Sequence, residues 1–276
     1  MQVSTVDNLS IEQLARLCRL EQRTIAVDGG RLKLEWGALQ AGRLSGAVLA
    51  EHDGELLGYM GRYKFGGERT EIAGVIDPQA RRRGIGTALL AEALRLGRGT
   101  GEQDALLVIR RDIAGGAVLA ERFGGTLHHS EHALLLSRRP VDGPTDPATI
   151  LRTMKAEDWP AVRALLADAF GFVQDAPSTE SGDRTLVIER DGAIVGTLRT
   201  SRHGERGGIY GFAVAESLRG QGIGRDVLRR ACRGLFDAGV PAVGLEVLVE
   251  NESALGLYTS LGFEPVTTED YYLLPT

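Results

Sequence analysis

The chain has 276 residues, of which 43% are hydrophobic and 25% are charged, and its formal net charge is −5. This is the composition of an ordinary globular protein, and it excludes a disordered chain, a collagen-like repeat and a disulfide-rich miniprotein. The negative charge gives no reason to expect binding to nucleic acid, and no run of about 18 apolar residues predicts a membrane span.

Taken in chain order, the first half predicts a mixture of helices and strands. A helix over residues 11–20 is followed by a hairpin around Asp53-Gly54, a dipeptide typical of tight turns between strands. An apolar strand at 72–76 leads into an Arg/Gly-rich loop and then a helix. A strand at 106–109, a short helix and a final strand complete the half.

The second half predicts the same order. A helix at 158–170, for which Asp158 is a fair N-cap, precedes a hairpin around Asp191-Gly192. A strand at 209–214 runs into a glycine-rich loop, and a strand at 243–249 comes later. Between them, apolar residues recur at the spacing of an amphipathic helix: Ile223, Val227, Ala231 and Leu235.

The two halves match at one offset of 138 residues. Asp53 falls on Asp191, and Glu131 falls on Glu269. The loop at 81–86 likewise falls on the loop at 219–224. Three matches at one offset indicate a duplicated domain and not a solenoid, whose repeats are shorter.

A proline-rich segment separates the repeats. Residues 140–147 contain three prolines and a glycine, which excludes a helix or a central strand. We therefore expect an N-terminal domain at 1–139, a linker at 140–148 and a C-terminal domain at 149–276. Each is expected to be an α/β (α+β) domain with a mixed, mostly antiparallel sheet flanked by helices.

The loop Arg219-Gly220-Gln221-Gly222-Ile223-Gly224 lies between a predicted strand and a predicted helix. Glycines there allow successive backbone N–H groups to point at one place, and the helix N-terminus adds its dipole. This favours a pyrophosphate site. Neither the P-loop pattern nor G-x-G-x-x-G is present, and the alternative is a glycine-rich turn without a ligand.

Two motifs in the second repeat carry a family resemblance. One is R-x-x-G-x-G at Arg219, Gly222 and Gly224, and the other is N-x-x-A-x-x-x-Y-x-x-x-G-F from Asn251 to Phe263. In this order and spacing they resemble the GNAT superfamily of acyl-CoA-dependent N-acyltransferases. The whole chain resembles bacterial tandem-GNAT acetyltransferases, with a looser likeness to mycothiol synthase, a two-copy enzyme whose second copy is the working one.

The first repeat matches this pattern less well. It keeps the loop residues Arg81, Gly84 and Gly86. In the second motif, however, Ala114 stands where Asn251 stands in the second repeat, and Glu121 stands where Tyr258 stands. We therefore expect the N-terminal domain to be catalytically impaired and the C-terminal domain to be catalytic.

The resemblance implies acetyl-CoA as co-substrate and assigns residues to it. The loop amides would hold the pyrophosphate, and the strand before the loop would pair with pantetheine. Tyr258 would protonate the departing thiolate as general acid; its alternative is a helix tyrosine packing beside Phe263. The cofactor-binding residues implied are Phe212, Ala213, Val214, Arg219, Gly220, Gln221, Gly222, Ile223, Gly224, Arg225, Asn251, Ala254 and Tyr258.

The general base is less defined. Enzymes of this family often carry a glutamate near the start of the strand before the loop, but that stretch of the second repeat, 207–210, has no carboxylate. Glu205, Glu246, Glu250 or a water chain are the candidates. We select Glu246, which alternates with apolar residues on its strand and would face either the cleft or solvent. In the first repeat, Glu71 occupies roughly the base position.

Other chemistry is not indicated. Cys18 and Cys232 have neither a disulfide framework nor a metal-ligand spacing, and His128, His129 and His132 are interpreted as a surface cluster, so no metal is expected. The first residues lack the features of a signal peptide, which predicts a cytoplasmic protein. Lys33 and Trp36 either line a substrate pocket or are a surface lysine and a buried tryptophan.

The sequence thus predicts an N-acetyltransferase that moves an acetyl group from acetyl-CoA to a primary amine of a small molecule or peptide by direct attack. We expect a monomer or homodimer with no nucleic-acid or membrane partner. The alternatives are a non-catalytic acyl-CoA-binding regulatory protein and an aminoacyl-tRNA-dependent ligase with paired GNAT folds. The ligase would need a basic tRNA-binding surface, which a net charge of −5 does not indicate.

Overall fold

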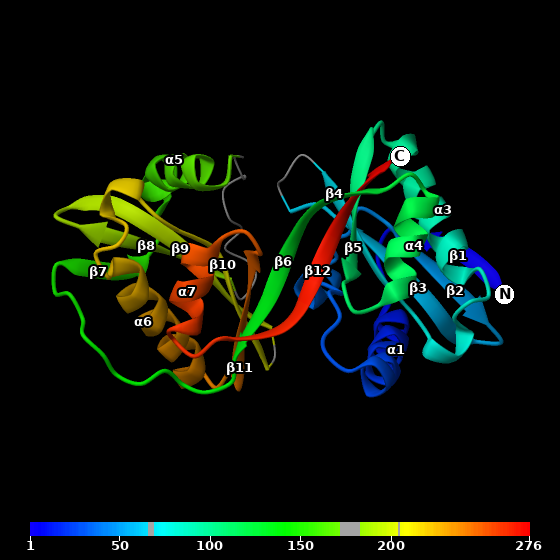
Figure 1. Ribbon diagram of the computed structural model, residues 1–276, viewed down its shortest axis with the longest axis horizontal. Coiled ribbons are helices and arrows are strands. Elements are labelled where there is room, and N and C mark those ends of the chain that lie inside the picture. The colour runs from blue at the N-terminus through cyan, green and yellow to red at the C-terminus, as the bar shows by residue number, and fades with distance from the viewer. Residues whose placement is uncertain (66–68, 172–182, 204) are drawn as a thin grey trace. The chain divides into compact units, whose positions relative to one another are not determined.

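The computed structural model describes residues 1–65, 69–171, 183–203 and 205–276 (Figure 1). The chain forms two compact units. Unit 1 contains Met1–Glu131 together with Val266–Thr276, and unit 2 contains His132–Pro265. These units differ from the repeats at 1–139 and 149–276, because the last strand of the second repeat belongs to unit 1.

Unit 1 contains the elements of the first repeat. Its strands are β1 (Gln2–Val6), β2 (Ala47–His52), β3 (Glu55–Tyr63), β4 (Thr70–Ile76), β5 (Asp104–Arg110) and the start of β6 (Thr126–Leu136). Its helices are α1 (Ile11–Asp28), α2 (Trp36–Gln40), α3 (Ile85–Gly99) and α4 (Ala114–Arg122), with a 3₁₀ turn at Pro78–Ala80. The predicted helix at 11–20 is therefore the first part of a longer helix.

Unit 2 has the same order of elements. Its strands are the end of β6, β7 (Thr149–Thr153), β8 (Arg184–Arg190), β9 (Ala193–His203), β10 (Arg206–Val214), β11 (Ala242–Leu248) and the first residues of β12 (Glu264–Pro275). Its helices are α5 (Trp159–Phe170), α6 (Ile223–Asp237) and α7 (Glu252–Thr259), with 3₁₀ turns at Ala156–Asp158 and Glu216–Leu218. The two units confirm the predicted mixed αβ fold.

The terminal strands of the repeats are exchanged. In unit 1 the strand order is β1-β2-β3-β4-β5-β12, and Glu269–Pro275 of β12 pair antiparallel with Asp104–Arg110 of β5. In unit 2 the order is β6-β11-β10-β9-β8-β7. Each sheet is thus completed by a strand from the other repeat. Most neighbouring strands are antiparallel, and β4/β5 and β10/β11 are parallel pairs.

Alternating side chains place a hydrophobic core on each face of the unit 1 sheet. Leu49 of β2 packs with α1 through Leu17 and Leu20, whereas its neighbour Val48 packs with α3 through Leu89. This is the period of two that a strand imposes on its side chains. In unit 2, one face of the sheet packs against α6 and α7 in a single large cluster.

The hairpin predictions are confirmed, and Asp158 is the N-cap residue of α5, as predicted. Asp53 and Asp191 adopt φ 49° and 51° in the two predicted tight turns. Asp158, however, does not cap α5 with its side chain. Its carboxylate instead accepts hydrogen bonds from Arg152 and from the backbone N–H of Lys155, because a 3₁₀ turn precedes the helix.

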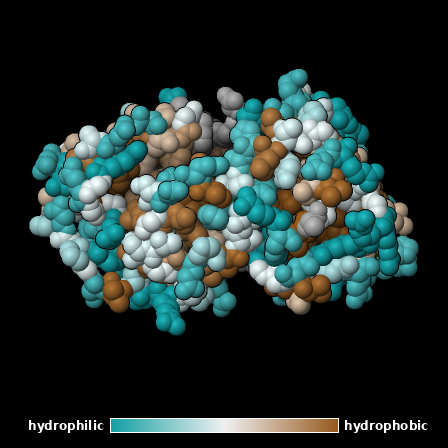
Figure 2. Space-filling model, in the orientation of Figure 1, coloured by the Kyte–Doolittle hydropathy of each residue, from teal (hydrophilic) through white to brown (hydrophobic). Residues whose placement is uncertain are grey.

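The surface in Figure 2 carries hydrophilic side chains with hydrophobic patches between them in each unit. Within the described ranges, every helix is too short or too polar to cross a membrane.

Candidate functional site

In unit 2, the parallel strands β10 and β11 pair over only part of their length, and we call the unpaired stretch between them the opening. Strands β10 and β11 pair only at Arg206–Gly208 with Ala242–Gly244. The pairing ends at Gly208, and the backbone of β10 continues to Val214. An unpaired strand edge presents N–H and C=O groups that an extended ligand can pair with. The predicted pantetheine-binding residues Phe212, Ala213 and Val214 lie on this edge.

A β-bulge interrupts β10 within the opening. The pairing of β10 with β9 shifts between Tyr210 and Ala213, so that Gly211 and Phe212 together oppose Leu198. Gly211 has φ 54°, a left-handed conformation that glycine adopts without strain. A bulge bends the strand and disrupts the hydrogen-bond ladder, and bulges are frequent beside active sites. The sequence analysis did not identify it, although a glycine inside a strand is its signal.

The predicted pyrophosphate loop leads directly into α6. Gly220 and Gly222 have φ 76° and 85°, and residues 219–222 are exposed. Ile223 is buried and anchors the first turn of the 15-residue helix, whereas Arg225 is exposed. A Cβ at Gly224 would lie 3.4 Å from Phe212 and 3.6 Å from Leu257, which is ordinary van der Waals contact, so the first turn of α6 lies against both residues.

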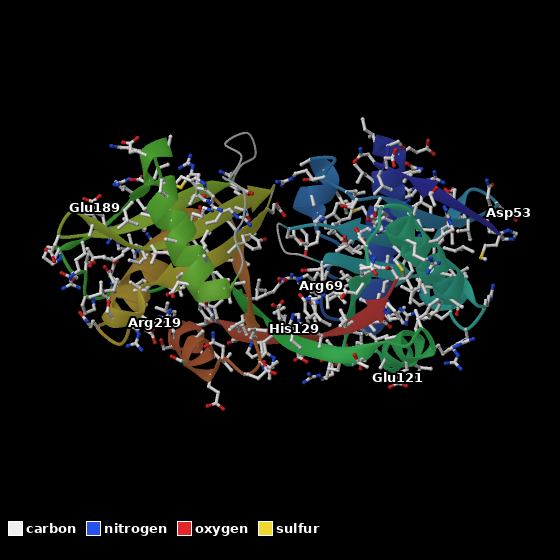
Figure 3. The ribbon with its side chains drawn as sticks, turned by 90° about the horizontal axis from the view of Figure 1, so that it is seen from above. Asp53, Arg69, Glu121, His129, Glu189 and Arg219 are labelled. Atoms are coloured by element: carbon white, nitrogen blue, oxygen red, sulfur yellow. The ribbon has the colours of Figure 1, made fainter. Side chains whose placement is uncertain are left out.

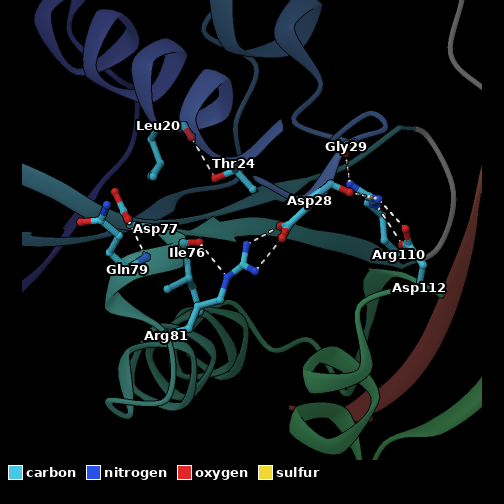
Figure 4. A network of polar contacts seen from close by, with 10 residues as sticks. All are labelled: Leu20, Thr24, Asp28, Gly29, Ile76, Asp77, Gln79, Arg81, Arg110 and Asp112. Atoms are coloured by element: carbon cyan, nitrogen blue, oxygen red, sulfur yellow. Dashed lines mark hydrogen bonds and ion pairs between the residues drawn. The ribbon is translucent and has the colours of Figure 1, made fainter. Parts of the chain in front are cut away.

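The two loops share a backbone but differ in their arginines. In unit 1, Arg82 and Gly84 have φ 63° and 80°, matching Gly220 and Gly222. The Arg81 guanidinium, however, forms a bidentate pair with Asp28 at the end of α1 (Figure 4), which lowers the pKa of that carboxyl. Both arginines donate from Nε to a strand carbonyl, Arg81 to Ile76 at 3.4 Å and Arg219 to Val214 at 2.9 Å, and Arg219 is exposed.

The second motif forms α7. The Asn251 side chain accepts a hydrogen bond from the N–H of Ala254 at 3.1 Å, so the structure places this pair at the helix N-cap. In unit 1, α4 begins without a side-chain cap. Gln221 is exposed in the loop and donates to the carbonyl of Ser217 at 3.4 Å.

Tyr258 of α7 lies in the core of unit 2 with 8% of its surface exposed. Its ring meets Phe263 edge-on at 5.9 Å between centroids. Burial, with a smaller effect of Cys232, raises the pKa of Tyr258 to about 12, so its phenol stays protonated at neutral pH. Burial alone likewise raises the pKa of the Cys232 thiol to about 12, which disfavours its reactive thiolate form.

Glu246 lies on the face of β11 opposite to the α6 cluster. Its neighbours Leu245 and Val247 both pack in that cluster, so Glu246 points to the other side of the sheet. The other two base candidates, Glu205 and Glu250, are exposed in turns.

The usual base position is occupied differently in the two units. Glu71 pairs with Tyr63 in unit 1, and the corresponding pair in unit 2 is Gly208 with Ser201. A Cβ at Gly208 would lie 2.6 Å from the hydroxyl of Tyr210. The Tyr210 phenol therefore occupies the space into which a side chain at position 208 would project. The sequence analysis did not single out Tyr210.

Unit 1 lacks several of these features. Strand β4 pairs with β3 in an uninterrupted register from Tyr63/Glu71 to Gly58/Ile76, so it has no bulge. The sequence analysis placed Glu121 at the position of Tyr258, but the structure places the buried Ala120 there, since its carbonyl accepts from the N–H of Gly125 as that of Tyr258 accepts from Phe263; Glu121 is exposed on α4 (Figure 3). What remains is the opening between β4 and β5, which pair only at Thr70–Ile72 with Ala105–Leu107, and the loop backbone.

The predicted histidine cluster has contacts of its own. His128 and His129 approach to 2.8 Å between Nδ1 atoms, and the His129 ring stacks on Tyr271 at 4.1 Å. Within the described parts of the chain, no group of three His, Cys, Asp or Glu side chains is placed to hold a metal ion. Lys33 is not a surface residue, since only 8% of its side chain is exposed.

Sequence comparisons identify relatives along the whole chain. A mycothiol acetyltransferase from Thermomonospora curvata is 30% identical over 300 residues, covering 98% of this chain and 96% of the relative. One from Rhodococcus opacus is 29% identical over 303 residues, covering 98% and 97%. These comparisons support an N-acetyltransferase and support neither the regulatory protein nor the aminoacyl-tRNA-dependent ligase.

Solved structures share the fold. A GCN5-related N-acetyltransferase from Sphaerobacter thermophilus aligns with a TM-score of 0.77 at 21% identity, covering 99% of this chain and 95% of that chain. A tandem GNAT protein from the clavulanic acid biosynthesis pathway aligns with a TM-score of 0.73 at 16% identity, covering 99% and 98%. The model of the acetyltransferase (GNAT) family matches twice, at residues 11–124 and 151–263. The chain therefore belongs to the GNAT acetyltransferase family, as an N-acetyltransferase with two tandem GNAT domains.

Proposed function

We propose that the second repeat transfers an acetyl group from acetyl-CoA to a primary amine of a small molecule or peptide by direct attack. The observation that carries this proposal is the β10 bulge at Gly211 and Phe212, inside the opening between β10 and β11. The first repeat has the same opening and the same loop backbone but no bulge.

The chain offers two places for the co-substrate. Backbone N–H groups at residues 219–225, of which 219–222 and Arg225 are exposed residues, suit the two phosphates of the CoA pyrophosphate together with the dipole of α6. The unpaired edge of β10 at Phe212, Ala213 and Val214 suits the amide groups of pantetheine, which add like a further strand.

The chemistry then follows from charge and proton balance. A backbone N–H at the bulge donates to the thioester carbonyl, where negative charge develops as the amine attacks. The new bond joins the amine nitrogen to the acetyl carbon, and the C–S bond breaks. Glu246 accepts the proton that the amine loses, and Tyr258 donates one to the departing thiolate. The products are an N-acetyl amide and free CoA.

The experiment measures release of the CoA thiol from acetyl-CoA with a panel of primary amines. The panel includes the amine on which mycothiol acetyltransferases act, because relatives with that name are 29–30% identical over nearly the whole chain. We expect turnover with at least one amine. Binding of acetyl-CoA without turnover of any amine would support the regulatory alternative instead.

Variants of the three candidate carboxylates test which of them is the general base. Glu246→Gln should lower kcat by roughly 10²–10⁴-fold, because general acid–base catalysis contributes about that much. Glu205→Gln and Glu250→Gln, which alter exposed carboxylates, are the controls and should retain activity. If one of these lowers the rate and Glu246→Gln does not, the base is assigned wrongly.

A further inference from the structure

The sheet of unit 2 has one hydrophobic face and one polar face. Residues on the first, among them Leu198, Ile209 and Leu245, pack against α6. The second face lies toward α5, as shown by Leu166 of α5, which is 3.6 Å from a Cβ placed on Gly211. We call this second face the α5 face. Its residues are Thr185, Val187, Thr197, Arg199, Ser201, Gly208, Tyr210, Gly244 and Glu246.

The corresponding face of unit 1 is a filled hydrophobic core. Strand registers match the two faces residue by residue, since Leu49/Tyr59 in unit 1 corresponds to Val187/Thr197 in unit 2. Tyr59, Tyr63, Leu106 and Val108 pack there with α1. At the same positions unit 2 has, in order, Thr197, Ser201, Gly244 and Glu246. The α5 face has thus exchanged large apolar side chains for small or polar ones.

Arg199 is a cation on this face without a carboxylate partner among the described residues. It stands where unit 1 has Gly61, and its guanidinium lies 5.4 Å from the centroid of the Tyr210 ring. Its Nε atom is buried and makes no hydrogen bond. The hydroxyl of Thr185, directly opposite on β8, is also buried and makes none. Buried polar atoms without partners are rare in folded proteins and call for an explanation.

Three groups form a row across the sheet beside the bulge. Arg199 on β9 pairs with Tyr210 on β10. Gly208 pairs with Gly244 on β11, so Glu246, two residues further along, has the same place on β11 that Tyr210 has on β10. Paired strands such as β9 and β10 lie about 4.8 Å apart, whereas the pairing of β10 with β11 ends at Gly208 and Gly244, before Tyr210 and Glu246. The row therefore runs from a cation through a phenol to a carboxylate, and the opening for the thioester lies between the last two.

We propose that the acceptor is an amino acid, that is, a primary amine that also carries a carboxylate, and that Arg199 binds the carboxylate. This rests on the proposed function of unit 2. A guanidinium pairs with a planar carboxylate through two parallel hydrogen bonds. Tyr210 positions that guanidinium through its ring. With the carboxylate held at Arg199, the amine lies over the opening, within reach of Glu246.

The test compares matched amines. Amino acids of increasing chain length are assayed beside their carboxamides and the amines that lack the group, by release of the CoA thiol. We expect kcat/KM for the best amino acid to exceed that of its carboxamide by at least about tenfold, because a hydrogen bond to a charged group contributes roughly 1.5–3 kcal/mol. A carboxamide or an aminoalkylphosphonate as good as the acid overturns the proposal.

Variants of Arg199 test whether this side chain binds the carboxylate of the acceptor. Arg199→Gln should raise KM for the amino acid by about 10- to 100-fold and leave the carboxamide unchanged, and Arg199→Lys should recover part of the loss. Arg202→Gln alters an exposed arginine of the same strand on the opposite face and should change nothing. Acetyl-CoA binding to Arg199→Gln shows that the variant is folded.

The outcomes separate the two proposals. If no amine of any class releases CoA, the proposed function fails. If carboxylate-free amines are acetylated as well as amino acids and Arg199→Gln changes neither, the function stands and the amino-acid acceptor is wrong.

Discussion

At the scale of single residues, the phenol of Tyr258 is protonated at neutral pH in the folded protein. Burial raises its pKa to about 12, two units above its ordinary value of 10. The folded protein therefore favours the protonated phenol, and the stabilisation this represents is lost as pH rises from 10 through 12. A proton donor is thus available to a leaving thiolate throughout the neutral range.

We expect Tyr258→Phe to lower kcat by roughly 10²–10⁴-fold. The loss should be equal at pH 7 and pH 9, because the phenol is protonated at both. Tyr59→Phe is the matched control, since it removes another buried hydroxyl from the unit that we expect to be impaired. Steady-state kinetics measure both, and equal losses for the two variants would contradict a role for Tyr258 in proton transfer.

Asp158 shows a residue-scale effect on stability. Hydrogen bonds from Arg152, and a further one from the N–H of Lys155, lower the pKa of Asp158 to about 2 from 3.8. The ionised carboxylate is favoured in the folded state. Its stabilisation is therefore present above pH 3.8 and is lost as pH falls through 2.

We expect Asp158→Asn to lower the free energy of unfolding at pH 7 by roughly 1–3 kcal/mol, the range for hydrogen bonds to a charged group. The difference from the unmodified protein should shrink as pH falls toward 2. Urea titrations at both pH values measure it. Asp237→Asn disrupts an exposed pair with Arg139 and should have little effect. A difference that stays constant with pH would exclude the carboxylate charge as its cause.

At the scale of elements, the two strand–loop–helix units have the same backbone and different surroundings. Gly222 and Gly84, at φ 85° and 80°, begin α6 and α3. A Cβ on either glycine meets no atom within 4 Å. Alanine at either position is thus strained by the left-handed backbone and not by crowding.

Alanine substitutions of these two glycines distinguish an effect on folding from an effect on acetyl-CoA binding. Gly222→Ala and Gly84→Ala should destabilise the protein by similar amounts, roughly 1–2 kcal/mol. Only Gly222→Ala should also raise KM for acetyl-CoA, by about tenfold or more. In the proposal, the backbone N–H groups of the loop that contains Gly222 face the pyrophosphate. Thermal melts and steady-state kinetics check both. If both variants raise KM equally, acetyl-CoA binding involves the two repeats alike.

The elements themselves were largely predictable. The Asp-Gly dipeptides and the apolar spacing from Ile223 to Leu235 determine local structure through short-range sterics and burial, and the hairpins and α6 lie where expected. Asp158 is the N-cap residue of α5, as predicted, but its side chain does not bond to the first turn of the helix, because the neighbouring Arg152 binds the carboxylate. The bulge was not identified, because it depends on how β10 aligns with β9.

At the scale of the whole molecule, the last strand of the second repeat completes the sheet of unit 1. Strand β12 belongs to the second repeat, yet Tyr271 is buried in unit 1. It accepts a hydrogen bond from Lys33 at 2.7 Å and donates one to Glu131 at 2.6 Å. Asp270 also accepts from Arg111 at 2.6 Å. Unit 1 is therefore incomplete without the last residues of the chain.

We expect Tyr271→Ala to destabilise unit 1, which consists mainly of the first repeat, by roughly 3–5 kcal/mol, the cost of removing a large buried aromatic side chain. Hydrogen exchange should accelerate in β5, which pairs with β12. Glu264→Gln, an exposed change at the start of β12, is the control. Acceleration confined to unit 2 would contradict the exchange of strands.

The sequence by itself determined the duplication, the order of elements and the family, because these are written in local patterns: the offset of 138 residues, the loop glycines and the motif from Asn251 to Phe263. Only the tertiary structure decided which strand completes which sheet and that the Tyr210 phenol fills the space beside Gly208. It also decided that Arg199 lies on a polar face. These features arise from contacts between residues far apart in the chain. A local sequence pattern cannot predict them, because strand register and burial depend on partners that lie outside the pattern.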